Sequence, residues 1–190
     1  MRKIITTVFI VALGFISNQL YALNDIYMKL VNSSGVQING EATAAGFVNW
    51  VKLSSTEQSN EANVTLGSTL SVSKPTTGDI TFQMPLNSTF GPLANLMYTG
   101  QRLLSVDVWF VKSGCTTTCV SYKIRMENVY VSKLSQVSDG EGNTVIQVSF
   151  TPTQFAWGYF RPASTGVLPA TPTTVFGWNK ATNGPFSYPF

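Results

Sequence analysis

The sequence predicts a mainly β domain with one short α-helix. Apolar and polar residues alternate with a period of two through most of the chain, which is typical of half-buried strands. Only residues 87–100 break this rhythm, with apolar residues at helical spacing. The pair Asp139-Gly140 lies between two strand-like runs and predicts a hairpin turn. These observations favour a β-barrel or two packed antiparallel sheets with a single helix.

Seven segments have the pattern of strands. In the first of them, Ile26, Met28 and Leu30 fall on one face. Pro152 in the last segment indicates a bulge or an edge position, because proline has no N–H for a ladder bond. The segments are residues 25–32, 47–55, 63–73, 79–84, 103–112, 119–134 and 144–160.

The helix is expected at about residues 89–99. Pro92 suits a first helical turn, and Ser88 or Thr89 is the candidate cap. Gly100 fits the left-handed residue that commonly ends a helix. The alternative for this segment is a loop.

Residues 161–190 differ from the rest in composition. Five prolines, mixed with glycine, threonine and asparagine, predict an irregular C-terminal tail that packs onto the domain or docks on a neighbour. Trp178 is the candidate for an exposed ligand contact, since it lies in this tail and could stack on a sugar or simply pack. The three other tryptophans, Trp50, Trp109 and Trp157, lie in strand-like runs and are expected in the core.

Residues 1–22 have the layout of a secretory signal peptide. Arg2 and Lys3 precede an apolar run that is short for a membrane span, and Ala22 suits the last residue before cleavage. The alternative is an uncleaved anchor. No later segment is apolar enough for a membrane helix, so stable membrane insertion is not expected. The domain would then comprise residues 23–160, followed by the tail.

Charge and cysteine usage narrow the classes of function. Without Arg2 and Lys3 the basic residues fall from 12 to 10 against nine acids, a net charge of about +1, so nucleic-acid binding is not expected. Three threonines separate Cys115 from Cys119, which an oxidising compartment would join as a disulfide at a hairpin tip. Two thiols without histidine make a poor zinc site, and the spacing exceeds that of the redox Cys-x-x-Cys motif.

The residues offer no catalytic constellation. The chain has no histidine, which removes Ser-His and Cys-His pairs and the ordinary histidine ligands of metals. Glu57 and Glu61 could form a carboxylate pair, but a solvated loop explains them better. Asp139 and Glu141, with a nearby asparagine, could ligate calcium, but a plain turn suffices. We therefore expect no enzyme, no catalytic residue, no metal and no cofactor.

Four stretches form an ordered series along the chain. They are residues 26–30; residues 38–43 with Gly46 and Trp50; residues 80–82 followed by Leu93, Leu96 and Gly100; and residues 122–132 followed by 148–150, Phe155, Trp157 and Tyr159. In this order and spacing they resemble the haemolysin-coregulated protein (Hcp) family, the tube protein of type VI secretion, over roughly residues 26–160.

The resemblance implies a ring-forming structural protein. Members of this family form hexameric rings of β-barrel subunits, so it implies a homo-hexamer and a role as a virulence-associated effector or carrier. The signal segment, the Cys115–Cys119 pair and the tail are additions to the family pattern. They favour a secreted protein, exported by Sec and then a type II system, over a subunit loaded into a type VI tube. The rival interpretation is a monomeric secreted module that binds a protein or a glycan through tail aromatics.

Overall fold

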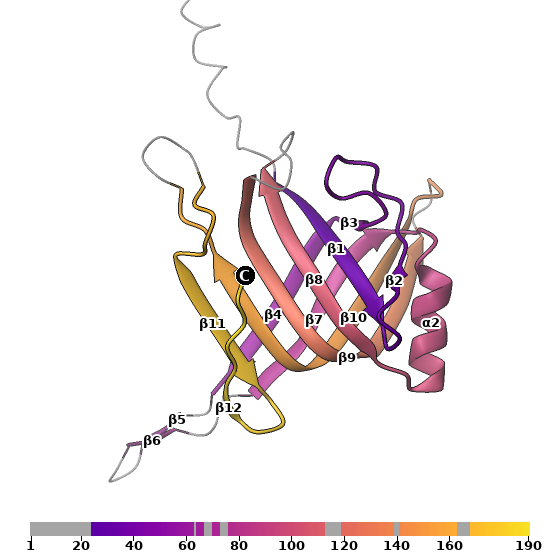
Figure 1. The fold of residues 1–190 in the computed structure, drawn as a ribbon. Coiled ribbons are helices and arrows are strands. Elements are labelled where there is room, and N and C mark those ends of the chain that lie inside the picture. The colour runs from indigo at the N-terminus through magenta and orange to yellow at the C-terminus, as the bar shows by residue number, and fades with distance from the viewer. Residues whose placement is uncertain are drawn as a thin grey trace, which may run out of the picture.

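The structure is a computed structural model, and it describes residues 24–62, 64–66, 70–72, 76–112, 119–138, 141–162 and 168–190. These residues form twelve strands and one helix (Figure 1), which confirms the predicted mainly β class. The strands are β1 Asn24–Asn32, β2 Gln37–Ile38, β3 Val51–Leu53, β4 Ser55–Glu61, β5 Val64–Leu66, β6 Leu70–Val72, β7 Thr76–Pro85, β8 Leu103–Lys112, β9 Val120–Ser138, β10 Thr144–Tyr159, β11 Thr174–Asn179 and β12 Gly184–Pro185, and the helix is α2 Phe90–Thr99.

One antiparallel sheet carries most of the fold. Its strands run in the order β12-β11-β10-β9-β8-β1-β2, while β7 pairs with β10 and β4 pairs with β7. Strand β3 pairs with β1, and only Ser54 separates β3 from β4. Ser54 donates its N–H to the carbonyl of Gln83 in β7 at 2.8 Å. The sheet therefore curls back on itself into a barrel-like shape (Figure 1).

The inside of the curled sheet is filled by one continuous apolar core. Alternate residues of each strand point inward, so we call that side the core face and the opposite side the outer face. In β1, Met28 and Leu30 are fully buried on the core face beside Ile26, as the alternation predicts. The other core residues with no exposed surface are Ile80, Phe82, Met84, Leu93, Leu103, Val106, Val108, Met126, Val129, Ile146, Val148 and Phe150.

Helix α2 packs at one end of the curled sheet, where Leu93 and Leu96 are buried against the core (Figure 1). Thr89 is the capping residue, and its side chain bonds Asn87 instead of the helix backbone. Gly100 ends the helix in the left-handed conformation, with φ of 65°. The predicted helix and its glycine stop are therefore confirmed, with the start one residue later than expected.

The strand predicted over residues 47–55 is wrong in its first half. Residues 44–49 form turns and bends, and the strand begins only at Val51. Gly46 and Asn49 have φ values of 84° and 64°, and these left-handed conformations interrupt an extended run. Trp50 consequently lies in the loop before β3, not in a strand.

The polar strand β4 was not predicted. Its sequence carries no apolar alternation because it is largely exposed, and it is held by its ladder with β7. The single strand predicted over residues 63–73 is also wrong, because β5 and β6 pair with each other in a separate small sheet. Strand β7 is longer than predicted and begins at Thr76.

Strand β10 changes its neighbour at Pro152. Its first half pairs with β7 up to Phe150, and its second half pairs with β11 from Gln154 onward. Pro152 pairs with Val129 of β9 on one side and falls between the β7 and β11 ladders on the other, and a register shift with β9 precedes it at Ser149/Phe150. The predicted edge or bulge position is confirmed.

The tail is more regular than its prolines indicate. Within it, β11 extends the sheet beyond β10, and β12 folds back on β11. Alternation returns over residues 174–179, where Phe176 and Trp178 share the core face while Val175 and Gly177 lie on the outer face. The tail packs onto its own domain.

Candidate functional site

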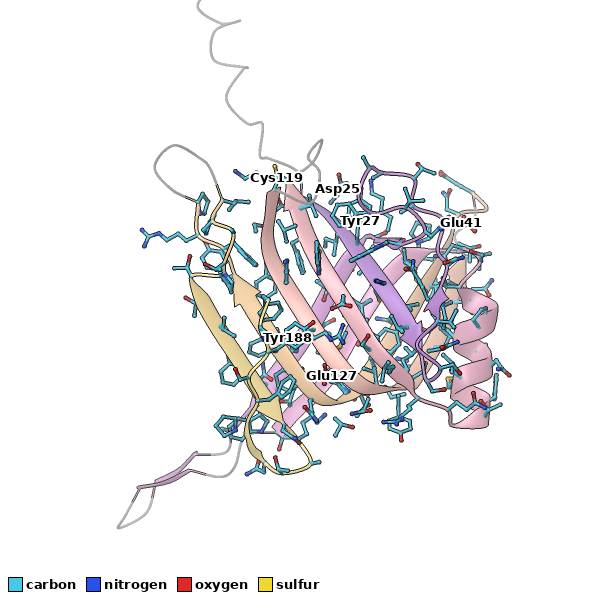
Figure 2. All side chains as sticks on the ribbon, viewed as in Figure 1. Asp25, Tyr27, Glu41, Cys119, Glu127 and Tyr188 are labelled. Atoms are coloured by element: carbon cyan, nitrogen blue, oxygen red, sulfur yellow. The ribbon has the colours of Figure 1, made fainter. Side chains whose placement is uncertain are left out.

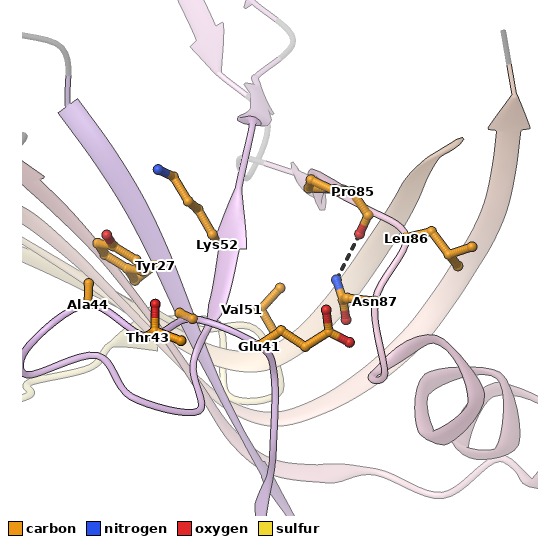
Figure 3. Close-up of a pocket in the computed structure, with 10 residues that line it drawn as sticks. Tyr27, Glu41, Thr43, Ala44, Val51, Lys52, Pro85, Leu86 and Asn87 are labelled. Carbon is orange, nitrogen blue, oxygen red and sulfur yellow. Dashed lines mark hydrogen bonds between the residues drawn. The ribbon is translucent and has the colours of Figure 1, made fainter. Parts of the chain in front are cut away.

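A first cleft, of about 360 Å³, opens beside the turn that carries Glu41 (Figure 3). A Cβ at Gly40 would lie 2.4 Å from the carbonyl oxygen of Trp50, so only glycine lets this turn approach the loop before β3. The Glu41 carboxylate accepts the Ser88 N–H at 2.8 Å and links the turn to the segment before α2. The lining residues are Tyr27, Glu41, Ala42, Thr43, Ala44, Val51, Lys52, Pro85, Leu86 and Asn87.

The charges of this cleft are already paired within the protein. Lys52 donates to the Asp25 carboxylate at 2.9 Å, and this bond raises the pKa of Lys52. Burial raises the pKa of the Tyr27 hydroxyl, and the nearby Asp25 charge adds to the effect. Glu41 is the single carboxylate among the lining residues, so the cleft holds no acid–base pair. Its arrangement suits packing or binding more than catalysis.

An aromatic cluster covers part of the outer face of the sheet. It is formed by Tyr27, Phe47, Trp50 and Trp109, and we call it the outer aromatic cluster. Phe47 stacks on Tyr27 with ring centroids 4.3 Å apart, and Trp50 meets Trp109 edge-on at 5.4 Å. The Lys123 ammonium lies 4.1 Å from the centroid of the Trp109 ring, and burial lowers the pKa of Lys123. Trp50 and Trp109, which the sequence predicts in the core, are instead partly buried against this smaller cluster on the outer face.

Three charged residues, Asp107, Arg125 and Glu127, lie on the outer face beside the aromatic cluster. Arg125 donates to Asp107 at 2.7 Å and lies 3.4 Å from Glu127. Burial lowers the pKa of Arg125, but its hydrogen bond to Asp107 and that carboxylate's charge outweigh burial and raise it. The Tyr188 ring covers the guanidinium at 5.1 Å, and Figure 2 shows Tyr188 on the same side of the sheet as Glu127.

Residues 184–190, which we call the strap, lie across small residues of β10 and β11. Phe186 donates its N–H to the Gly177 carbonyl at 3.0 Å. A Cβ at Gly177 would lie 2.1 Å from the Phe186 carbonyl oxygen, and one at Gly158 would lie 2.8 Å from the Phe190 ring. The strap therefore fits its seat only because these two positions have no side chain.

A second cleft, of about 380 Å³, lies on the core face where β11 adds to the sheet, and we call it the aromatic cleft. Trp157 and Phe176 stack in it with ring centroids 5.0 Å apart and planes 24° apart. Phe155 meets Trp157 at 5.1 Å. The lining residues are Asn60 of β4, Thr77 of β7, Phe155 and Trp157 of β10, and Phe176 and Trp178 of β11.

The structure therefore places Trp178 in a cleft with three other aromatic rings. Trp178 is partly buried against the core and directly opposite Phe155 in the ladder. Sequence reasoning did not connect Trp178 with Phe176, although the alternation over residues 174–179 carries that signal. Nothing local points to Asn60 or Thr77, because their place in the cleft depends on how the sheet curls.

The remaining predicted site residues fall elsewhere. Cys115 lies outside the described residues, while Cys119 immediately precedes β9, at the same end of the sheet as Asp25 (Figure 2). Glu57 and Glu61 belong to the exposed strand β4, not to the loop that was expected. Asp139 of the predicted hairpin turn is also outside the described residues. The predicted disulfide and the predicted signal peptide over residues 1–22 are thus not tested by the described part of the chain.

Metal ligation and membrane crossing can be examined for the described residues alone. In that part of the chain, no three histidine, cysteine, aspartate or glutamate side chains lie close enough together to hold a metal ion. The helix found there has 10 residues, which is too short to span a bilayer.

Solved structures of type VI secretion proteins share this fold. The Hcp1 protein of the E. coli EAEC 042 pathovar matches with 17% identity and a TM-score of 0.62, over 82% of this chain and 99% of that one. Hcp1 of Salmonella typhimurium matches with 17% identity and a TM-score of 0.66, over 86% and 99%. A structure described as a type six secretion system protein reaches a TM-score of 0.76 with 16% identity, over 86% and 100%.

The sequence itself carries the family pattern from β1 to β10. No curated protein sequence matches the chain. Residues 27–159 do match the family described as type VI secretion system effector, Hcp, and this span runs from β1 to the last residue of β10. Strands β11 and β12 and the strap lie beyond the matched span. The chain therefore belongs to the Hcp family of type VI secretion system effectors.

Proposed function

We propose that this chain acts as a secreted, non-enzymatic structural protein whose subunits assemble head to tail into a homo-hexameric ring. The observation that carries the proposal is the family match over residues 27–159, which covers every strand of the curled sheet from β1 to β10. The two described clefts support a non-enzymatic role. The charges of the first cleft, beside Glu41, are paired within the protein, and no titratable group lines the aromatic cleft. The ring would serve as an effector or carrier in virulence.

A ring interface needs an apolar centre on the subunit surface, and the described residues offer one. Val137 and Val145 stand directly opposite each other in β9 and β10, and their side chains are 65% and 37% exposed. Leu86, 48% exposed, adjoins them because its N–H bonds the Thr144 carbonyl. We call these three residues the apolar patch. A neighbouring subunit that covered it would bury apolar surface and close a ring if its rotation is sixfold.

Light scattering on the mature, oxidised protein tests the ring. We expect a particle of six subunit masses that persists on dilution. Val137→Glu puts a charge at the centre of the apolar patch and should yield monomers. Val36→Glu is the matched control, because Val36 is 59% exposed in the turn after β1, away from the patch. A wild-type monomer would refute the ring, and a hexameric Val137→Glu variant would refute this interface.

The route of export is part of the same proposal. We propose that residues 1–22 direct Sec export and are removed, that a type II system then carries the protein outside, and that Cys115 and Cys119 form a disulfide on the way. The small covalent loop that this disulfide closes would add about 2 kcal/mol to the free energy of unfolding in the loop-entropy model. Intact mass spectrometry of the secreted protein should give a chain that starts at Leu23 and lacks two hydrogens. A mass that includes residues 1–22, or two free thiols, would contradict this route.

A further inference from the structure

We propose that the aromatic cleft is a binding site for a neutral saccharide. Two of its four rings, Phe176 and Trp178, come from β11, which lies beyond the span that matches the family. The site therefore combines residues of the matched span with two rings from the segment that follows it. It lies within one subunit and does not depend on the proposed ring.

The walls of the cleft suit a ring-shaped ligand with an apolar face. Phe155, Trp157, Phe176 and Trp178 alternate along β10 and β11, so all four point to the core face. Phe155 is almost fully buried and forms the floor, while Phe176 is 47% exposed and open to a ligand. The C–H face of a pyranose packs well on such flat rings. The volume of about 380 Å³ falls in the range of small-ligand pockets.

The polar groups of the cleft come from the opposite wall. Asn60 and Thr77 pair in the ladder between β4 and β7. The register of that ladder shifts between Gln58 and Asn60, and such bulges re-aim the next side chain. A Cβ at Gly78 would lie 2.7 Å from the Ser59 hydroxyl, so the glycine makes room for the bulge. The Asn60 amide and the Thr77 hydroxyl thus line the cleft, where sugar hydroxyls would meet them, and the Asn60 amide oxygen also accepts a bond from Gln58 Nε2 at 3.4 Å.

One donor in the cleft wall is unpaired. The indole N–H of Trp157 is buried and has no acceptor among the described residues. A buried donor without a partner is unfavourable, and a shift of the Trp157 ring on binding would let a ligand oxygen supply the missing bond. A hydrocarbon chain could fill the apolar space but could not accept this hydrogen. The unpaired donor therefore favours a ligand that carries both an apolar face and oxygen atoms.

The charge of the cleft completes the assignment. None of its six lining residues is charged, so an ionic ligand would lose its hydration without gaining a counter-charge. A neutral saccharide avoids this cost.

Titration with neutral oligosaccharides tests the assignment. The probes are maltopentaose, cellopentaose and chitopentaose, followed by tryptophan fluorescence and calorimetry on the mature protein. We expect at least one to bind with a dissociation constant in the millimolar range or below. Phe176→Ala removes the exposed stacking face and should weaken that binding roughly tenfold, equivalent to about 1.4 kcal/mol. Asn60→Ala should weaken binding too, because it removes a polar group that lines the cleft. Asn60 is exposed, so its loss should leave the fold intact.

Tyr98→Ala is the matched control, since Tyr98 is 84% exposed on α2 and lies outside the cleft. It should bind like the wild type, and circular dichroism should show all three variants folded. The proposal is overturned if none of the oligosaccharides binds. It is also overturned if binding survives both cleft variants, or if octanol quenches the cleft tryptophans while every saccharide fails to do so.

Discussion

The seat of the strap makes Gly177→Ala a sharp test of the packing described above. Alanine is the better strand residue, and by itself the change should add about 0.5–1 kcal/mol to stability. The new Cβ, however, would lie 2.1 Å from the Phe186 carbonyl oxygen and 3.2 Å from the Ala156 Cβ. Both neighbours are backbone or short, so neither can swing aside. The strap must lift from the sheet.

The cost of lifting the strap follows from the contacts that it makes. The 3.0 Å bond from Phe186 to Gly177 is worth about 1 kcal/mol. The Tyr188 ring over Arg125 adds about 1 kcal/mol at this half-buried position. The short pairing of β12 with β11 contributes a similar amount, about 1 kcal/mol. After the gain from alanine is subtracted, Gly177→Ala should lower the free energy of unfolding by about 2 kcal/mol.

Urea denaturation followed by tryptophan fluorescence measures this change. Gly91→Ala is the control, because a Cβ at Gly91 in α2 would meet nothing within 4 Å. It should change the free energy of unfolding by less than about 1 kcal/mol, because the helix gain from alanine is offset by the clash of its Cβ with the ring of Pro92 that follows. If Gly177→Ala proves as stable as the wild type, the strap does not hold its seat and the reasoning fails.

Three further predictions concern the core, the outer face and the response to pH. Phe82→Ala should destabilise the protein by about 3–5 kcal/mol, because Phe82 is fully buried against Phe150; a urea midpoint unchanged from wild type would contradict this. Asp107→Ala leaves Arg125 half-buried with only Glu127 and should cost about 1–3 kcal/mol in the same assay, whereas no loss would mean that solvent replaces the carboxylate. Burial raises the pKa of Tyr122 from 10.0 to about 12, so its folded-state pKa exceeds the unfolded one and stability should fall as pH rises through that interval. Tyr122→Phe should flatten this decline, measured as urea midpoints between about pH 8 and about pH 11, and an equal decline in the variant would refute the assignment.

The elements that sequence reasoning predicted well are those that a local pattern decides. In β1 the alternation of Ile26, Met28 and Leu30 suffices, because one face of this strand is buried and the other is not. The helix was equally readable, since Leu93 and Leu96 keep helical spacing and Gly100 ends it. Pro152 indicated an edge, and the structure places it where β10 changes neighbours.

The elements that sequence reasoning missed depend on partners far away in the chain. Strand β4 has no apolar alternation to reveal it, and only its ladder with β7 makes it a strand. The prolines of residues 161–190 predicted an irregular tail instead of β11, although the spacing of Phe176 and Trp178 already fitted a strand. Phe47 and Trp50 look like strand residues but belong to a loop, because the left-handed Asn49 lies between them.

The same distinction applies to the site. The sequence points to Trp178 as an aromatic residue in an unusual segment, but it does not identify its neighbours. Its partners Phe155 and Trp157 come from β10 through a register that composition cannot reveal. Asn60 and Thr77 enter only through the curl of the sheet. A sequence can thus nominate one wall of a cleft while the opposite wall remains unknown until the fold is seen.

The change of neighbour along β10 also imposes an order on folding. The ladder from Gln154 to Tyr159 can be completed only after residues 174–179 are available, and Arg125 is covered only after Tyr188 has emerged. Until then the second half of β10 presents a bare strand edge, which other chains can join. Because these late contacts span long separations in sequence, we expect slow final closure and a transient, aggregation-prone intermediate. A chain that crosses a membrane unfolded would keep this edge unpaired until residues 174–179 arrive.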